Sequence, residues 1–483
     1  MATLLKTTDT QSAIEELGAL LGDRLSTSPA VCEHHATGET YHAPRPPDAV
    51  VFPETTEEVA EIVRICAAHG VPMIPYGVGT SVEGNVCALE GGVTLDMGRM
   101  NQVLRVSQED LDVTVQAGVT RKQLNTHLRD TGLFFPIDPG ADATLGGMTA
   151  TRASGTNAVR YGTLKENVLG LTVVLPDGQI IKTGGRARKS AAGYDLTRLF
   201  VGSEGTLGVM TEITLKLYGI PEAISAAVCS FPSLEAAVNT VILTIQSGIP
   251  IARVELLDDI QMDACNKFSK LDYAPKDTLF FEFHGTERGV AEQVEQVREI
   301  VQEFGGSDFR WSTKPEERNA LWQARHDVYY ACLALQPGKK GWATDVCVPI
   351  SRLAECLIET KEELDASPLL APIVGPRRRR QFPRLLPHRP GRSGRDGRGQ
   401  APQRTHDRPR TRHGRDQHGR ARHRLRQAGV PGGRARRRGR RPHAHAQADG
   451  RSPQPDESRE SGRRLTAGLC SRLWRASNAS FKE

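Results

Sequence analysis

The feature that most limits what this chain can fold into is a change of composition at Gly375. From Pro376 onward arginine, proline and glycine dominate, and aromatic residues are almost absent. The segment carries a net charge of about +23 and the preceding residues about −17, although the whole chain of 483 residues carries only +6. A segment of this composition has too little apolar surface to build a core. We therefore expect a folded region that ends near residue 375, followed by a disordered tail.

The composition also limits the class of protein. The chain is long enough for about two or three domains. Its 9 cysteines are scattered without a C-x-x-C pair, which argues against a zinc site and a disulfide framework. No apolar run reaches the ~18 residues of a membrane span, and the first 20 residues lack a signal-peptide core. We expect a soluble cytoplasmic enzyme with at most peripheral membrane contact.

Short strands and helices alternate in the first half of the chain. A helix is predicted from Thr55 or Thr56, either of which can cap it, to Gly70, which ends it. Further along, residues 121–132 are expected to be helical. This alternation indicates an α/β or α+β fold. Strands are predicted at 71–77, 91–97, 111–118 and 171–178.

The pattern changes near Tyr218. A strand followed by a helix is predicted over 226–248, another strand over 277–285 and another helix over 289–304. We therefore expect a second α+β domain over about residues 221–375. No internal repeat is visible.

The first glycine-rich element is PYGVGTSVEG, residues 75–84. Glycines at this spacing let backbone N–H groups approach an anion, and two hydroxyl side chains add donors, which suits a pyrophosphate. The spacing is neither G-x-G-x-x-G nor that of a P-loop, so a Rossmann site and an NTPase are both disfavoured. A simple tight turn remains an alternative.

Two further elements are rich in glycine. Residues 138–163 contain five glycines separated by small residues, with Leu145, Met148, Val159 and Tyr161 interspersed for burial. Backbone of this kind packs closely against a flat ligand or other backbone, and a plain surface loop is the alternative. The third element, residues 202–217, is a turn that leads into a strand.

Together these elements resemble the FAD-binding domain of the vanillyl-alcohol-oxidase/PCMH flavoprotein family. Four segments, 143–163, 188–208, 252–271 and 322–353, resemble more narrowly the cytochrome-linked D-lactate dehydrogenases, with glycolate oxidase flavin subunits and D-2-hydroxyglutarate dehydrogenases as relatives. The resemblance implies an α+β fold with a two-part, PCMH-type FAD-binding domain. It implies these divisions: an N-terminal segment at 1–44, the FAD-binding domain at 45–220, an incomplete substrate domain at 221–375 and an out-of-frame tail at 376–483.

The resemblance also implies which residues bind FAD. The first element would hold the pyrophosphate, the second would line the flavin, and the third would close over the adenine or ribitol side. In some relatives a histidine of the first loop attaches FAD covalently; Thr80 occupies that position here, so we expect non-covalent FAD. The implied residues are Pro75, Tyr76, Gly77, Val78, Gly79, Thr80, Ser81, Gly84 and Asn85; Pro139, Gly140, Thr144, Gly146, Gly147, Ser154, Gly155, Asn157, Ala158 and Tyr161; and Glu204, Gly205 and Val209.

In the second domain, Arg325 resembles the family's clamp for the substrate carboxylate. A guanidinium fork can bind a carboxylate through two parallel hydrogen bonds. The alternative is an ordinary salt bridge at the surface or between domains.

The implied reaction is oxidation of a D-2-hydroxy acid, most simply D-lactate to pyruvate. Hydride passes to flavin N5 and electrons pass on to a cytochrome or quinone. In the relatives a divalent metal, zinc or manganese, polarises the hydroxyl and a histidine takes its proton. The relatives carry these groups in H-V-G-D-G-N-F-H and G-E-H-G motifs, and neither motif is present in this sequence.

A shifted reading frame accounts for the missing motifs. In a GC-rich gene, codons read out of frame yield many arginines. When each codon is read from its second base, residues 376–383 accommodate H-V-G-D-G-N-F-H and residues 419–427 accommodate G-E-H-G-I-G-F-G-K. Residues 456–460 accommodate the family ending M-N-P-G-K in the same frame. We therefore interpret the tail as frameshifted, so this chain would keep FAD but lose its metal, its base and its activity.

Alternative functions remain. Within the enzyme class these are a glycolate or D-2-hydroxyglutarate dehydrogenase. Outside it is an FAD-binding pseudoenzyme with a basic interaction tail. A nucleic-acid partner is not expected, because aromatic residues and a folded platform are missing beside the arginines. The expected location is cytoplasmic, with contact at the inner membrane face at most, or mitochondrial in a eukaryote.

Overall fold

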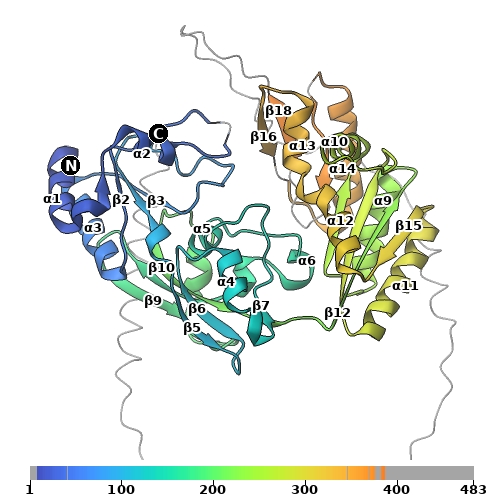
Figure 1. The fold of residues 1–483 in the computed structure, drawn as a ribbon, viewed down its shortest axis with the longest axis horizontal. Coiled ribbons are helices and arrows are strands. Elements are labelled where there is room, and N and C mark those ends of the chain that lie inside the picture. Colours follow the sequence, from blue (N-terminus) through green and yellow to red (C-terminus); the bar gives the residue numbers. More distant parts are fainter. Residues whose placement is uncertain (1–7, 41, 345, 369, 376–381, 387–483) are drawn as a thin grey trace, which may run out of the picture. The chain divides into compact units, whose positions relative to one another are not determined.

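Two α+β regions follow one another along the chain, and the pattern changes between them near Tyr218 (Figure 1). We call residues 8–219 the N-terminal region and residues 220–386 the C-terminal region. The computed structural model describes residues 8–40, 42–344, 346–368, 370–375 and 382–386.

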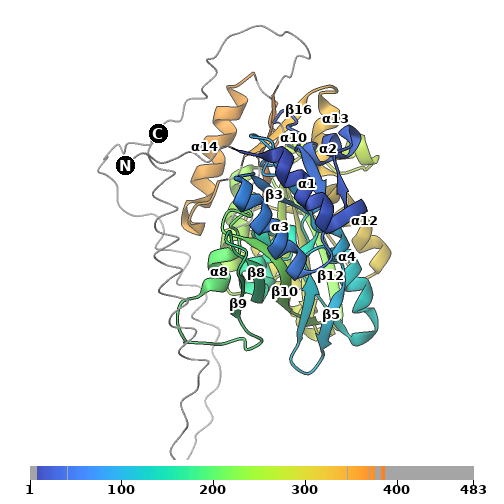
Figure 2. The same ribbon diagram turned by 90° about the vertical axis from the view of Figure 1, so that its left-hand side faces the viewer.

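The N-terminal region begins with a small, mostly parallel sheet in the order β1-β2-β4-β3. Strands β2 and β3 both run parallel to β4, and α3 connects β2 to β3. The first helix, α1, packs against α3, and the two are seen side by side in Figure 2. The elements are α1 (Thr10–Leu21), β1 (Leu25–Ser26), α2 (Pro29–Ala36), β2 (Ala49–Val51), α3 (Thr56–His69), β3 (Met73–Tyr76) and β4 (Val93–Asp96).

Helix α3 forms where the local sequence predicts it. The Thr55 side chain caps its first turn by accepting a hydrogen bond from the Glu58 backbone N–H, at 3.1 Å. Gly70 ends it in the left-handed conformation, with φ of 69°, which glycine adopts without strain. The apolar stripe, which includes Ile62 and Val63, is buried. The predicted helix is therefore confirmed.

A second, antiparallel sheet follows in the order β5-β6-β10-β8-β9. Helix α3 packs on β8 and β10, where Thr56 Oγ1 donates to Thr211 Oγ1 at 2.9 Å. Strand β5 was not predicted because its residues are only partly buried, which weakens the alternation of apolar and polar residues. The strands are β5 (Val103–Ser107), β6 (Asp112–Gln116), β8 (Val168–Val174), β9 (Ile180–Gly184) and β10 (Val209–Lys216).

The second glycine-rich element folds into short helices joined by tight turns. Thr144 caps the first of them by accepting from the Gly147 backbone N–H at 3.3 Å. The short elements around it are α4 (Arg121–His127), β7 (Leu133–Phe134), α5 (Leu145–Ala150), α6 (Ala158–Tyr161), α7 (Leu164–Asn167), α8 (Leu196–Phe200) and β11 (Tyr218–Gly219).

The C-terminal region is built on an antiparallel sheet in the order β15-β12-β14-β13-β17. Successive side chains of a strand point to opposite faces, and here both faces are buried under helices. One cluster joins Phe281 and Phe283 to α9, α11 and α14, and the other joins Phe280 to α10 and α13. The elements are β12 (Ala223–Ser230), α9 (Leu234–Gln246), β13 (Arg253–Leu257), α10 (Asp259–Ser269), β14 (Thr278–Gly285), α11 (Glu287–Glu303), β15 (Ser307–Ser312), α14 (Leu353–Asp365) and β17 (Val374–Gly375).

The last described elements complete this region. Along the chain, helices α12 (Pro315–His326) and α13 (Val328–Leu335) follow β15. Strand β16 (Lys340–Thr344) comes next and pairs with β18 (Phe382–Leu386) in a two-stranded sheet. The expected disordered tail lies outside the described residues except at β18, whose five residues FPRLL form an apolar stretch in the arginine-rich segment.

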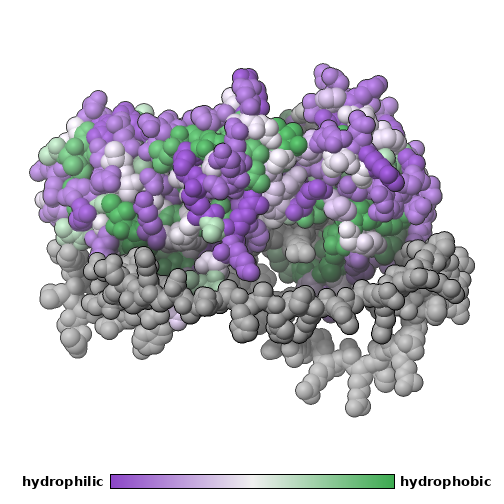
Figure 3. All heavy atoms as spheres, turned by 90° about the horizontal axis from the view of Figure 1, so that it is seen from below, coloured by the Kyte–Doolittle hydropathy of each residue, from purple (hydrophilic) through white to green (hydrophobic). Residues whose placement is uncertain are grey.

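The described surface is largely hydrophilic on the face seen in Figure 3, with apolar residues in separate patches. Within the described ranges, no helix is both long enough and apolar enough to cross a membrane. The eight cysteines that the structure describes carry thiols, and no disulfide joins any of them.

Candidate functional site

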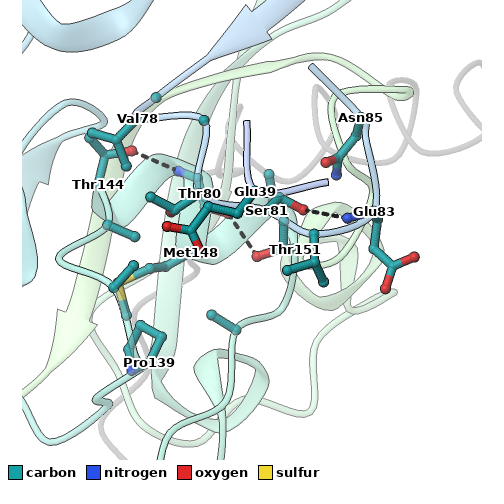
Figure 4. Close-up of a pocket in the computed structure, with 18 of the residues that line it drawn as sticks. Glu39, Val78, Thr80, Ser81, Glu83, Asn85, Pro139, Thr144, Met148 and Thr151 are labelled. Carbon is teal, nitrogen blue, oxygen red and sulfur yellow. Dashed lines mark hydrogen bonds between the residues drawn. The ribbon is translucent and has the colours of Figure 1, made fainter. Parts of the chain in front are cut away.

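A cavity of about 860 Å³ gathers the three glycine-rich elements, which are far apart in the sequence. The loop after β3, the segment that leads into α5 and the turn before β10 all line it. Figure 4 shows Val78, Thr80 and Ser81 of the first element beside Thr144 and Met148 of the second. Its volume falls in the roughly 300–1,000 Å³ range of small-molecule and cofactor sites.

The first wall of the cavity is made mainly of backbone. Gly79 has φ of +66°, and a Cβ there would lie 2.6 Å from the Tyr76 hydroxyl. A Cβ on Gly77 would collide with Thr144 Oγ1, so the first and second elements touch at this point. Only glycine fits such close approach, and it leaves the backbone open to a ligand.

The first loop rests on a buried histidine. His35 Nε2 lies 3.0 Å from Asp96 Oδ2, its Nδ1 lies 2.8 Å from the Val31 carbonyl, and its ring centroid is 4.6 Å from that of Tyr76. Burial opposes the charged form of His35, but hydrogen bonds to Asp96 and to Val31 outweigh it and raise its pKa. The ring thus joins α2 to β4 and supports the tyrosine under the first loop.

The floor of the cavity is α5 and the residues packed against it. A Cβ on Gly146 would lie 2.7 Å from the Ala117 Cβ and 2.8 Å from its carbonyl oxygen, so α5 packs directly on the chain after β6. Ala150 and Thr151, the residue at which α5 ends, continue this floor. Gly146, Ala117 and Ala150 all have small side chains or none. The narrow side chains leave room for a flat ligand above the helix.

The third element is held to the floor by backbone hydrogen bonds. Gly202 N–H donates to the Thr149 carbonyl and Glu204 N–H donates to the Ala150 carbonyl, each at 3.0 Å. Glu204 itself has φ of +52°, a strained conformation for a residue other than glycine. This turn delivers Glu204, Gly205 and Val209 to the cavity.

One polar atom of the cavity lining lacks a partner. Asn85 Oδ1 is buried and makes no hydrogen bond within the described protein. An unsatisfied buried amide oxygen is unfavourable and fits a site that a polar ligand completes.

The second wall comes from the C-terminal region and consists of side chains. Arg325 Nε lies 2.9 Å from Glu255 Oε2, and Glu255 is only 1% exposed. Both line the cavity, together with Tyr329 and Tyr330. Arg325 is therefore at once a cavity residue and a member of an ion pair between β13 and α12, so the two alternatives considered for it are not exclusive.

Most of the sequence-predicted cofactor residues line this cavity, and so does Arg325. Five lie outside its lining, and several of these are engaged elsewhere: Asn157 and Tyr161 contact the C-terminal region through Arg253 and His284, at 2.8 and 2.9 Å. The five are Gly84, Gly155, Asn157, Ala158 and Tyr161.

Sequence reasoning missed several lining residues. Glu39 follows α2, Arg152 follows α5, and Glu255 lies on β13. No local motif marks them as site residues. The sequence does contain one signal for Glu255. It stands between Val254 and Leu256 in an apolar strand, and a carboxylate at a buried strand position is unusual.

Metal ligands were expected only in the intact family. Within the ranges that the structure describes, no group of three or more His, Cys, Asp or Glu residues is placed to hold a metal ion. The positions that accommodate the family's metal motifs, 376–383 and 419–427, lie outside the described residues apart from 382 and 383.

Two family models match the chain. The FAD binding domain matches residues 47–184, and the C-terminal domain of FAD linked oxidases matches residues 220–375. The first range contains the first two glycine-rich elements and the second contains the wall made of side chains, while the third glycine-rich element lies between the two matched ranges.

Among proteins of similar sequence, a probable mitochondrial D-lactate dehydrogenase of Danio rerio is 54% identical over 374 residues, which cover 77% of this chain and 75% of that protein. A mitochondrial D-lactate dehydrogenase [cytochrome] of Arabidopsis thaliana is 48% identical, covering 75% of this chain and 64% of that protein. A glycolate oxidase subunit of Bacillus subtilis is 37% identical, covering 64% and 66%.

Solved structures share the fold at lower identity. An alkyldihydroxyacetonephosphate synthase superimposes with a TM-score of 0.65 at 21% identity, covering 78% of this chain and 80% of that one. A substrate-bound p-cresol methylhydroxylase gives 0.61 at 19% identity, covering 78% and 82%. These likenesses show the two-part fold with its C-terminal domain.

Proposed function

This chain belongs to the FAD-linked oxidases that include the D-lactate dehydrogenases, and on that premise we propose that its cavity holds non-covalent FAD for the oxidation of D-lactate to pyruvate. The observation that carries the proposal is the convergence of three glycine-rich elements and Arg325 on one cavity. The 54% identity to a probable D-lactate dehydrogenase supports the choice of substrate.

The cavity residues fit FAD. The first loop offers backbone N–H groups and the Thr80 and Ser81 hydroxyls, which suit an anionic pyrophosphate. The small residues above α5 suit a flat ring, and the unpartnered Asn85 Oδ1 can accept a hydrogen bond from it or from a ribityl hydroxyl. Thr80 lacks the imidazole of the covalent linkage. When bound, FAD supplies the hydride acceptor for the reaction.

The second wall suits the substrate. A guanidinium carries five N–H donors, so the ion pair through Arg325 Nε leaves donors on the same side chain for a carboxylate. Glu255 fixes the orientation of this fork by holding Nε. A 2-hydroxy acid bound there would lie inside the cavity that also receives the cofactor.

The proposal includes a shifted frame after Gly375. Val374 and Gly375 line the cavity, so the change of composition begins at the cavity wall. The histidine base and the ligands for zinc or manganese would then be missing from this chain. We expect FAD binding to persist and D-lactate oxidation to be lost.

The test compares this 483-residue chain with a version whose frame is restored at codons 374 to 378. Both should bind FAD in an equilibrium titration followed by flavin fluorescence. Only the restored version should reduce a dye when D-lactate is added. Dye reduction by the unrestored chain would contradict the loss of activity, and failure of both to take up FAD would contradict the cofactor assignment.

For the electron acceptor we propose a cytochrome, because three of the related dehydrogenases are named for one; a quinone is the alternative. Relatives of this chain are mitochondrial, so we propose that location for a eukaryotic source, with at most peripheral membrane contact. Reduction of cytochrome c or of a soluble quinone by the restored, D-lactate-fed enzyme separates the acceptors.

A second candidate substrate is glycolate, favoured by the 37% identity to a glycolate oxidase subunit, and D-2-hydroxyglutarate is a third. A panel of the three acids with the restored enzyme ranks them. A pseudoenzyme with a basic interaction tail is the alternative from another class. Salt-sensitive nucleic-acid binding that disappears when the chain is truncated at Gly375 would favour it.

A further inference from the structure

The segment between β7 and α6 contains α5 and lines the cavity, and Asp138 joins its two ends by hydrogen bonds. Asp138 Oδ1 accepts from the Asn157 backbone N–H at 2.9 Å, and its Oδ2 accepts from the Thr156 hydroxyl. A side chain at Gly155 would collide with Asp138. The loop residues between these ends include Pro139, which lines the cavity. The position of Asp138 therefore sets the position of this part of the cavity wall.

A guanidinium from the other region binds the closing point of this loop. Arg253, on β13, donates from Nε to Asn157 Oδ1 at 2.8 Å, and its Nη2 lies 3.4 Å from Asp138 Oδ2. Its Nε also lies 3.2 Å from Glu282 Oε1, and its Cζ lies 5.1 Å from the centroid of the Trp322 ring. The Arg253 side chain is 17% exposed, so its contacts are only weakly screened by solvent.

The acceptors around Arg253 belong to one hydrogen-bond network. Glu282 Oε1 lies 2.7 Å from His284 Nε2, and His284 Nδ1 lies 2.9 Å from the Tyr161 hydroxyl. Burial alone would raise the pKa of Glu282, but the hydrogen bond from His284 and the charge of Arg253 leave it lowered. Arg253 thus contacts two carboxylates of this network, Asp138 and Glu282.

We propose that Arg253 is a positioning residue for bound FAD: from the substrate domain it holds the loop at 138–157 in the shape that receives the cofactor. The inference rests on the proposed function, because it concerns the FAD of that same cavity. Its consequence is that the C-terminal region contributes to cofactor affinity through residues that do not line the cavity. FAD binding is then coupled to the position of strand β13, which carries Arg253.

The experiment measures the FAD dissociation constant of the full 483-residue chain and of matched variants. Arg253→Gln is expected to weaken FAD binding about tenfold, as for a coupled contact of moderate strength. Arg253→Lys keeps the charge but loses the guanidinium fork, so its FAD dissociation constant should lie between those of the unchanged chain and Arg253→Gln. The control is Arg298→Gln, which removes an arginine with the same kinds of contact, an ion pair to Glu295 and a ring contact on Phe309, but on α11 and closer to the surface.

A double-mutant cycle tests the route through Asp138. If Arg253 acts through that carboxylate, Arg253→Gln combined with Asp138→Asn should weaken FAD binding no more than the stronger single variant. Losses that simply add in the double variant would overturn the proposal, and so would an Arg253→Gln protein that binds FAD as tightly as the unchanged chain.

A further variant separates positioning from a merely structural role. In Arg253→Met/Glu282→Gln both partners of the buried ion pair are neutral, so folding should recover, as judged by the thermal midpoint without FAD. FAD affinity should remain about tenfold weaker, because Asn157 and Asp138 still lack their donor. Recovery of affinity together with stability would overturn the positioning role. If the unchanged chain itself takes up no FAD, the proposed function fails with it, whereas the outcomes above affect Arg253 alone.

Discussion

The two walls of the cavity are built from different materials. The wall from the N-terminal region is mainly backbone and small side chains, with Gly77, Gly79 and Gly146 at points where a Cβ would collide with a neighbour. The wall from the C-terminal region is the Arg325–Glu255 pair and two tyrosines. Backbone recognises a large cofactor by shape and by N–H groups, whereas a charged side chain selects a small anionic substrate. Changes in the first wall should therefore affect FAD, and changes in the second should affect the carboxylate ligand.

The largest effect is expected from Arg325→Ala. It removes the guanidinium that pairs with Glu255, whose carboxylate is 1% exposed, and removal of one partner of a buried ion pair costs about 3–5 kcal/mol. Unfolding followed by circular dichroism in denaturant measures the loss. Arg325→Ala/Glu255→Gln should recover most of the stability, yet a flavin spectral shift on adding a 2-hydroxy acid should stay absent. A normal shift in either variant would contradict the clamp.

Gly146→Ala should damage the first wall. The new methyl group would lie 2.7 Å from the Ala117 Cβ, and overpacking of this kind costs about 1–3 kcal/mol. FAD affinity should fall along with the unfolding midpoint. Gly140→Ala is the matched control, because Gly140 also lines the cavity but has open space where its Cβ would be. Equal effects of the two substitutions would argue against the close packing of α5.

The stability of the C-terminal region should respond to pH through Asp258, which does not line the cavity. Burial raises the pKa of this carboxyl to about 7 from 3.8, and Asp258 N–H bonds the Ile373 carbonyl beside β17. Between these two pH values the folded chain keeps a proton that the unfolded chain has lost. The contribution of protonated Asp258 to the free energy of unfolding is therefore complete below about pH 4 and is lost as the pH rises through 7. Burial raises the pKa of Asp277 to about 6, so this carboxyl changes the stability in the same direction.

Asp258→Asn isolates this effect. The amide cannot ionise but keeps an oxygen for the Gln261 N–H, now bonded at 2.8 Å. We expect the variant to be more stable than the unchanged chain at pH 8, by more than about 1 kcal/mol, and equally stable near pH 4. Denaturant midpoints at the two pH values measure it, with Asp263→Asn, a partly exposed carboxylate on the same helix, as control. A gain of the same size at both pH values would exclude a titration effect.

The smallest effect is expected at the helix beneath the first wall. Thr55→Ala removes the side-chain cap of α3 and should cost about 1 kcal/mol, while Thr55→Ser should cost less because it keeps the hydroxyl. The FAD dissociation constant should not change, since α3 packs on the sheets and does not line the cavity. A change in that constant would show that cofactor binding depends on the stability of the whole region.

Local features of the fold could be predicted from the sequence because neighbouring residues decide them. The cap and the end of α3, the strand before the first loop and the helix over 289–304, which the structure extends to Glu287–Glu303, depend on side chains a few positions apart. Strand β5 was missed because a partly exposed strand lacks clear alternation. The glycine-rich elements were predicted as ligand loops because glycine spacing reports backbone exposure, whatever the tertiary context.

The sequence by itself determined the α+β pattern, the family and the three glycine-rich segments, because these depend on local chemistry and on spacing along the chain. Only the tertiary structure decided that Arg325 is both a cavity residue and the partner of a buried glutamate. It also decided that Asn157 and Tyr161 serve the contact with Arg253 and His284 rather than the cavity lining. Such assignments depend on which buried donor lies within about 3 Å of which acceptor, and residues about 70 to 120 positions apart meet only when the chain has folded.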